Sequence, residues 1–220
     1  MLARVQTTLR EMGFHPTSRL KTVGTIIEKL VRDRTRLSTM QDIAGVRIVE
    51  DVSLDQQDEI VATIQGSLGG TVIDRRRDPT HGYRAVHIVT RVDDRLVEIQ
   101  VRTRLQNLWA QLMETLADRV GRGIRYGEAP ADRRHRELVD DLKKMSKVIS
   151  EYEALHARRD ELERSLAEVV VPPTRLRARL AIARSRRRVA SVRRELAVND
   201  EWLIGHLERI LGRWEEGDLR

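Results

Sequence analysis

The distribution of glycine divides this sequence into two parts and constrains the fold more than any other feature. Residues 1–127 mix glycines with short β-branched runs and helical segments, whereas residues 131–216 contain only Gly205 and Gly212. Glycine punctuation and β-branched runs are typical of strands and turns, and long glycine-poor segments with helical spacing are typical of helices. We therefore predict a mixed α/β domain over residues 1–127 and an all-α extension over residues 131–220.

The order of the elements in the first part predicts a sheet covered by helices. Apolar spacing indicates helices over 25–32 and 105–116, and a third, capped by Ser53, that ends at Gly69-Gly70. β-Branched runs indicate strands over 46–49, 71–73, 85–90 and 96–101. Helix, strand, helix, three strands and helix make a mixed β-sheet flanked by helices, an α/β or α+β domain.

The second part has an apolar stripe from Leu138 to Tyr152 with alternating spacings of four and three, as in a coiled coil or helical hairpin. Pro172-Pro173 should break the helix, a second helix should run over 175–196, and Asn199 or Asp200 should cap a last one. The narrow stripe predicts homo-oligomerisation through the C-terminal helices. The alternative is that it packs within the chain.

Charge is unevenly distributed in these helices. Residues 175–194 contain nine arginines and no acid, while residues 151–168 carry six acids. One interpretation is that the helices pack antiparallel, so that their charges meet or are solvated. The other is a face that binds RNA or another partner.

Composition narrows the classes of function. The absence of cysteine excludes disulfide scaffolds, thiol nucleophiles and cysteine-bound zinc. No apolar run is long enough for a membrane helix, so a cytoplasmic protein without membrane contact is expected. Seven aromatic residues are few for a protein that stacks single-stranded bases. The net charge of +7 is compatible with ligands that carry phosphates.

Three short segments of the first part carry residues suited to phosphate chemistry. Arg19 and Lys21 enter a helix on which Thr25 and Lys29 share a face, as in a triphosphate site, although surface cations are common. Asp42 stands just before a strand. Strand alternation places Glu98, Gln100 and Arg102 on one face.

The two acidic residues of these segments, Asp42 and Glu98, would together suit one Mg²⁺, which prefers carboxylate oxygens plus substrate phosphates. A segment between them, HGYRAVH at 81–87, offers Tyr83 as a flat ring beside the polar Arg84 and His87. An ordinary half-buried strand tyrosine is the alternative interpretation of Tyr83.

Taken together, these segments resemble the RelA/SpoT synthetase family, the alarmone pyrophosphokinases. The resemblance rests on RLKTVGTIIEKL at 19–30, DIAGVRIV at 42–49, HGYRAVH at 81–87 and EIQVRT at 98–103, four segments in the family's order. It implies a nucleotidyltransferase-like fold. It also implies transfer of the β,γ-pyrophosphate of ATP to the ribose 3′-hydroxyl of GDP or GTP.

The resemblance also implies roles for individual residues. Asp42 and Glu98 match the acidic pair that would bind Mg²⁺, and Glu98 would share the metal or help to deprotonate the attacking hydroxyl. The ATP and phosphate residues would be Arg19, Lys21, Thr25, Lys29 and Arg47. The acceptor residues would be Tyr83, stacking on guanine, with Arg84, His87, Gln100 and Arg102.

Two other functions stay open. The arginine-rich segment and the positive charge suit a toxin-like relative that uses the same chemistry on the 3′ end of tRNA. A catalytically inactive module that binds nucleotides or docks through its helices is the non-enzymatic alternative. The retained acidic pair and the basic segment favour an enzyme, and a Tyr83 that stacks guanine favours a free nucleotide as acceptor.

Overall fold

The computed structural model describes residues 1–34, 36–168 and 176–216, in two compact units, Met1–Ala110 and Gln111–Arg220. The division between the units falls inside α4 (Arg104–Val120). The domain bounds predicted from the sequence, 1–127 and 131–220, stay a prediction. In the described part, no helix is both long enough and apolar enough to cross a membrane.

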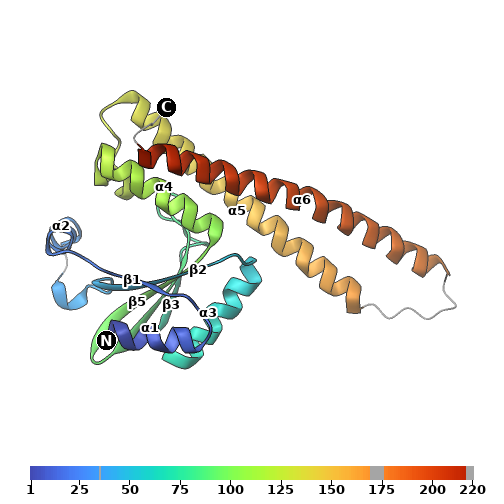
Figure 1. Ribbon diagram of the computed structural model, residues 1–220, viewed down its shortest axis with the longest axis horizontal. Helices are drawn as coiled ribbons and strands as arrows, with labels where there is room; N and C mark the ends of the chain where they lie inside the picture. The colour runs from blue at the N-terminus through green and yellow to red at the C-terminus, as the bar shows by residue number, and fades with distance from the viewer. Residues whose placement is uncertain (35, 169–175, 217–220) are drawn as a thin grey trace. The chain divides into compact units, whose positions relative to one another are not determined.

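The first unit is built on a five-stranded mixed sheet in the order β1-β2-β5-β4-β3 (Figure 1). β2 and β5 are parallel, and the other three pairs are antiparallel. The mixed sheet predicted from the sequence is confirmed. The strand bounds are Thr17–Leu20 for β1, Ala44–Glu50 for β2, Thr71–Asp74 for β3, Val86–Val92 for β4 and Arg95–Thr103 for β5.

One face of this sheet is apolar, and two helices cover it. α1 (Leu2–Glu11) contributes Val5 and Leu9, and α3 (Leu54–Leu68) contributes Val61 and Ile64. They pack on alternate residues of the central strands, so that the opposite faces of the same strands are left for polar residues. The strand residues of this core are Val46, Ile48, Val86, Ile88, Val97, Ile99 and Val101.

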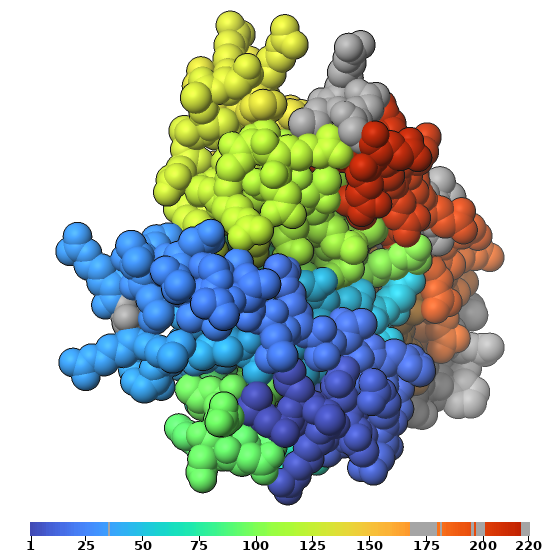
Figure 2. Space-filling view, turned by 60° about the vertical axis from the view of Figure 1, so that its left-hand side comes forward, coloured from blue at the N-terminus to red at the C-terminus, as the bar shows by residue number. Residues whose placement is uncertain are grey.

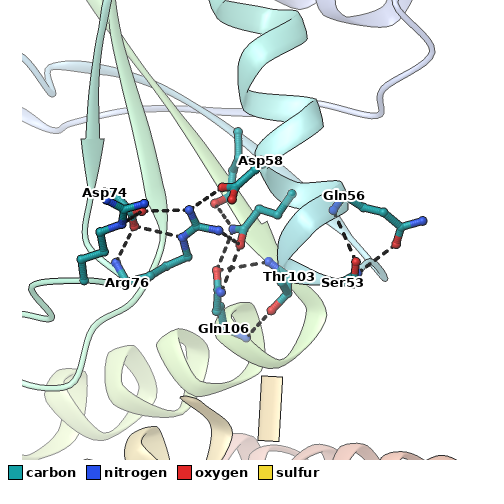
Figure 3. Close-up of polar contacts among 10 residues, drawn as sticks. Ser53, Gln56, Asp58, Asp74, Arg76, Thr103 and Gln106 are labelled. Carbon is teal, nitrogen blue, oxygen red and sulfur yellow. Dashed lines mark hydrogen bonds and ion pairs between the residues drawn. The ribbon is translucent and has the colours of Figure 1, made fainter. Parts of the chain in front are cut away.

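The predicted start of α3 is confirmed. The Ser53 side chain accepts from the Gln56 amide, and the Gln56 side chain accepts from the Ser53 amide, which makes a reciprocal capping box (Figure 3). The helix ends at Gly69, and Gly70 has a φ of 113°. A Cβ on Gly70 would lie 2.6 Å from the Val89 carbonyl oxygen, so glycine is required where the chain turns back beside β4.

The sequence did not predict α1 and β1. The signal for α1 was present but short: Leu2, Val5 and Leu9 recur at helical spacing within ten residues, and Val5 and Leu9 are buried. β1 is a fully exposed edge strand that is defined by backbone pairing, for example of Arg19 with Gly45. The N-terminus is held in place by ion pairs of the Met1 amino group and Arg4 with Asp93, in the β4–β5 turn that lies against it in Figure 2.

The second unit contains two long helices, α5 (Arg133–Glu168) and α6 (Leu176–Glu216), which lie side by side in Figure 1. The Tyr152 hydroxyl donates to the Leu196 carbonyl across them at 2.9 Å. The predicted break at Pro172-Pro173 lies outside the described residues. A separate last helix capped at Asn199 or Asp200 was a wrong prediction, because α6 runs through this point and residues 176–204 contain no proline or glycine.

The stripe from Leu138 to Tyr152 is largely buried within the single chain. Leu142 and Ile149 are only 3% and 1% exposed, while Leu138, Met145 and Tyr152 are half-buried. Packing within the chain, the alternative named for this stripe, therefore accounts for its apolar residues. Oligomerisation stays a prediction that needs another surface.

Candidate active site

The face of the sheet opposite the apolar core carries a cluster of polar side chains. Glu98, Gln100 and Arg102 alternate along β5 with the buried Val97, Ile99 and Val101, as the sequence predicted. His87 on β4 is paired in register with Gln100, and Arg47 on the parallel β2 is paired with Gln100 from the other side. Three adjacent strands thus present their polar residues at one place.

Four of these side chains, Glu98, Gln100, Arg102 and His87, form a closed ring of hydrogen bonds with Tyr83. Glu98 Oε1 lies 3.0 Å from His87 Nδ1, and His87 Nε2 lies 2.8 Å from the Tyr83 hydroxyl. Arg102 Nη2 donates to the Tyr83 hydroxyl at 3.1 Å and to Gln100 Oε1 at 2.8 Å. Gln100 Nε2 donates to Glu98 Oε2 at 2.7 Å and closes the ring. A closed ring of this kind fixes each rotamer through two neighbours, and so preorganises the site.

Tyr83 reaches this ring through an unusual turn. His81 and Gly82 both have positive φ, 54° and 92°, and the Tyr83 amide donates to the Thr80 carbonyl. Left-handed backbone at a residue other than glycine is uncommon and occurs often at functional sites. The turn brings the tyrosine beside Arg102, whose guanidinium lies 5.1 Å from the ring centroid. Burial raises the pKa of Tyr83, which keeps its hydroxyl protonated.

Glu98 is a carboxylate at all physiological pH values. Burial by itself would raise its pKa, but the hydrogen bond and charge of His87 and the Gln100 amide outweigh burial, and the charge of Lys29 adds to them. The pKa of Glu98 is therefore about 2. A group with such a low pKa is a poor proton acceptor near neutral pH and a good ligand for a cation.

Asp42 lies at the N-terminal approach to β2, three residues before Gly45, which pairs with Glu98. Lys29 of α2 (Val23–Asp33) donates to Asp42 Oδ2 at 2.6 Å, and the Lys21 ammonium lies 3.4 Å from the same oxygen. Lys29 also lowers the pKa of Glu98. The positive charge of Lys29 thus pairs with Asp42 and also favours the ionised form of Glu98.

The chemistry of these two carboxylates suits a divalent cation. Asp42 Oδ1 is buried and has no hydrogen-bond partner among the described residues, so one oxygen of the pair is free to coordinate. The described part of the chain holds no group of three or more metal-ligating His, Asp or Glu residues. An ion here would have two carboxylates and would complete its shell from phosphates and water, the pattern that Mg²⁺ favours.

The other residues predicted for the site are less closely connected. Arg19 is exposed on β1, and the Thr25 hydroxyl donates to the Thr22 carbonyl at the start of α2. Arg47 is half-buried on the polar face, and its charge lowers the pKa of Tyr83 against the effect of burial. Arg84 lies apart from the ring: it is buried and donates to the Arg76 carbonyl at 3.0 Å.

Arg76 is a residue whose importance sequence reasoning missed. Its guanidinium bonds to Asp74 of β3 and to Gln57 and Asp58 of α3 (Figure 3). Burial would raise the pKa of Asp74, but the side-chain and backbone hydrogen bonds of Arg76 hold it below its ordinary value. The only sequence signal is one arginine within Arg75-Arg76-Arg77, and nothing in that run shows which of the three is buried.

The Gln57 amide extends this cluster to the end of β5. Gln57 is fully buried and donates to the Val101 carbonyl and to Gln106 of α4, both at 2.9 Å. The Gln106 side chain in turn accepts from the Thr103 amide. The cluster ties α3, β3, β5 and the start of α4 together just behind the loop that carries Tyr83, and so supports the ring without belonging to it.

The low pKa of Glu98 predicts a local loss of stability in acid. Because the folded pKa is below the ordinary 4.5, the stabilisation is fully present above pH 4.5 and is lost as pH falls toward 2. Between about pH 5 and 3, we expect the wild type to lose about 2 kcal/mol more than Glu98→Gln does. Hydrogen exchange of the β4 and β5 amides measures this loss. Glu11→Gln, at an exposed site, should follow the wild type, and equal losses in wild type and Glu98→Gln would contradict the assignment.

Comparison with known proteins identifies the region that carries the site. Residues 18–117 match the model of the region found in RelA / SpoT proteins. An uncharacterised protein of Mycobacterium tuberculosis is 48% identical over 118 residues, which are 52% of this chain and 43% of that protein. GTP pyrophosphokinase YjbM of Bacillus subtilis is 34% identical over 119 residues, 46% of this chain and 54% of that protein. The matched segment thus covers about half the length of these curated relatives.

Solved structures agree with the fold. The crystal structure of small alarmone synthetase 1 from Bacillus subtilis matches with a TM-score of 0.54 at 26% identity, over 74% of this chain and 88% of that chain. A crystal structure of the same synthetase bound to its product pppGpp matches with a TM-score of 0.50, over 71% of this chain and 86% of that chain. Both likenesses extend beyond the segment matched by the family model.

Proposed function

Residues 18–117 of this chain match the region found in RelA / SpoT proteins, and from that premise we propose that the protein transfers the β,γ-pyrophosphate of ATP to the 3′-hydroxyl of GDP or GTP. The product would be (p)ppGpp, made in the cytoplasm for a stringent response. The observation that carries the proposal is the ring around Glu98 and Tyr83, beside an Asp42 that two lysines hold. The pppGpp-bound neighbour supports a guanine nucleotide as acceptor.

The proposed step balances as a substitution at phosphorus. The acceptor 3′-oxygen forms a bond to the β-phosphorus of ATP, the bond from that phosphorus to the α,β-bridging oxygen breaks, and AMP leaves. The hydroxyl proton passes to solvent. Such a transfer needs in-line positioning and neutralisation of charge more than covalent help from the protein.

The residues near Asp42 would supply the neutralisation. Lys21 and Lys29 are flexible ammonium groups within 3.4 Å of a carboxylate, so they can turn to the ATP phosphates when those enter. Asp42 and Glu98 would hold Mg²⁺, which neutralises charge on the transferring phosphates when bound. The pKa of Glu98, about 2, argues for this role and against a role in taking the hydroxyl proton.

The ring would position the acceptor. The Arg102 guanidinium and the Gln100 and His87 side chains hold the Tyr83 hydroxyl and the Glu98 carboxylate in place through hydrogen bonds. A tyrosine fixed at its hydroxyl end offers a rigid flat surface, on which a purine base can stack at little entropic cost.

Product identification tests this function. The full chain is incubated with ATP, Mg²⁺ and, separately, GDP, GTP or bulk tRNA, and the products are identified by mass. The proposal predicts AMP together with a pyrophosphorylated guanine nucleotide. Modification of tRNA alone would contradict it in favour of the toxin-like activity. No AMP with any acceptor would contradict it in favour of a binding module.

A further inference from the structure

The outer face of α6 carries a cluster of arginines that the proposed reaction does not use. Ile182 and Val189 are half-buried and Leu196 is buried, at spacings of seven residues, so this side of α6 faces inward. Leu196 lies beside Tyr152 of α5, which donates to its carbonyl. A spacing of seven keeps the three residues in one stripe along a helix of 3.6 residues per turn.

Four exposed arginines lie on the side of the helix away from this apolar stripe. At 3.6 residues per turn they fall within about a third of the helix circumference, so they share one face. No acidic residue interrupts the sequence from 180 to 194. We name this surface the outer arginine face, and its residues are Arg184, Arg187, Arg188 and Arg194.

The acidic residues of α5 do not neutralise this face. Among the described residues of both helices, Arg193 is the one arginine between 184 and 194 that forms an ion pair, with Glu163 at 3.7 Å. Arg193 lies toward the packed side of α6, whereas the outer arginine face points away from it. The prediction that charges meet between antiparallel helices therefore accounts for Arg193 and not for the other four.

We propose that the outer arginine face binds the phosphate backbone of a nucleic acid. Residues 184 to 194 span about 15 Å along the helix axis, over which one strand presents about four phosphates. Four arginines over this length match that charge density. The planar guanidinium fork suits bidentate contact with phosphate oxygens, and every cation of this segment is arginine.

Two other partners fit the surface less well. A helix lying in a membrane interface needs a broad apolar face for insertion, and the apolar stripe of α6 faces inward. An acidic protein surface seldom presents closely and regularly spaced charges, whereas a phosphate backbone does so along its whole length. The scarcity of aromatic residues indicates backbone binding without base stacking.

The test compares the full chain with two variants of equal net charge. One variant neutralises the outer arginine face as R184Q/R187Q/R188Q/R194Q. The matched control removes four exposed arginines from other surfaces, as R10Q/R95Q/R119Q/R134Q. Fluorescence anisotropy with a labelled RNA hairpin, a single-stranded RNA and a DNA duplex is measured over a range of salt concentrations, and circular dichroism verifies the helix content of each variant.

We expect the outer-face variant to bind at least about tenfold more weakly than the wild type. The slope of log K against log salt concentration should also be shallower by about three, since each lost phosphate contact removes about 0.7 to 0.9 from that slope. The control should stay close to the wild type. The three probes then show whether RNA, DNA or both are bound. Neither variant should change pyrophosphate transfer, so this result is independent of the proposed reaction.

Three results would overturn the proposal. The first is a wild type that binds none of the nucleic acids at low salt. The second is an equal loss in the control, which would mean that only net charge matters. The third is tighter binding to phosphatidylserine vesicles or to polyglutamate, with the same dependence on the outer arginine face, which would assign the face to a membrane or to an acidic protein.

Discussion

Replacing Asp42 with asparagine should lower kcat for pyrophosphate transfer by at least about a thousandfold, which corresponds to about 4 kcal/mol of transition-state stabilisation. The amide keeps the size of the side chain and loses the charge that its buried Oδ1 offers to a cation. Glu98→Gln should have an effect of the same order, because it removes the second carboxylate, whose Oε2 accepts from the Gln100 amide. Initial rates of AMP release measure both effects.

The control for this prediction is Asp140→Asn, which removes a carboxylate from α5 and should keep full turnover. Circular dichroism should show that both site variants are folded. The unfolding transition should be nearly unchanged in Asp42→Asn, since Lys21 and Lys29 are partly exposed and can be solvated. Glu98→Gln should be less stable than the wild type at neutral pH, because it lacks the interactions that lower the pKa of Glu98. Wild-type turnover by either Asp42→Asn or Glu98→Gln would contradict the roles assigned to the acidic pair.

Replacing Arg76 with methionine should destabilise the first unit by about 3 kcal/mol. The side chain is 10% exposed and contacts Asp74, Asp58 and Gln57, so its loss leaves the half-buried Asp74 carboxylate with only the exposed Arg77 nearby. Such a change costs more than the loss of an exposed ion pair, which is worth about 0 to 1 kcal/mol. Urea unfolding, together with hydrogen exchange of the β3 and β4 amides, measures the difference in the free energy of unfolding between the wild type and this variant.

Arg77→Met is the matched control, because the neighbouring side chain is 86% exposed and lies 3.4 Å from the same Asp74. We expect it to change the stability by less than about 0.5 kcal/mol. Comparable losses in the two variants would show that Arg76 has no special role in joining β3 to α3.

The sequence predicted the central part of the fold because the pattern there has a strict physical cause. Strands with one buried face must alternate, so the positions of Glu98, Gln100 and Arg102 follow from the run that contains them. The capping box at Ser53 is likewise a local signal. The mixed sheet followed from the order of these elements.

Other features depend on long-range partners and leave little or no local signal. β1 exists because its backbone pairs with β2, and α1 is held by the packing of Val5, Leu9 and Leu2 on the core. The contact between Lys29 and Asp42, and the burial of Arg76 instead of its neighbours, arise only when separate elements meet. Arg84 stands beside Tyr83 in the sequence, but its guanidinium donates to the carbonyl of the distant Arg76, and a role in binding the acceptor stays a prediction.

A crystal structure of the full chain with Mg²⁺ and a non-hydrolysable ATP analogue tests the central claim most directly. The account predicts one Mg²⁺ coordinated by an oxygen of Asp42 and an oxygen of Glu98, with Lys21 and Lys29 on the phosphates. A nucleotide bound at this face with its metal held by neither carboxylate would contradict the account.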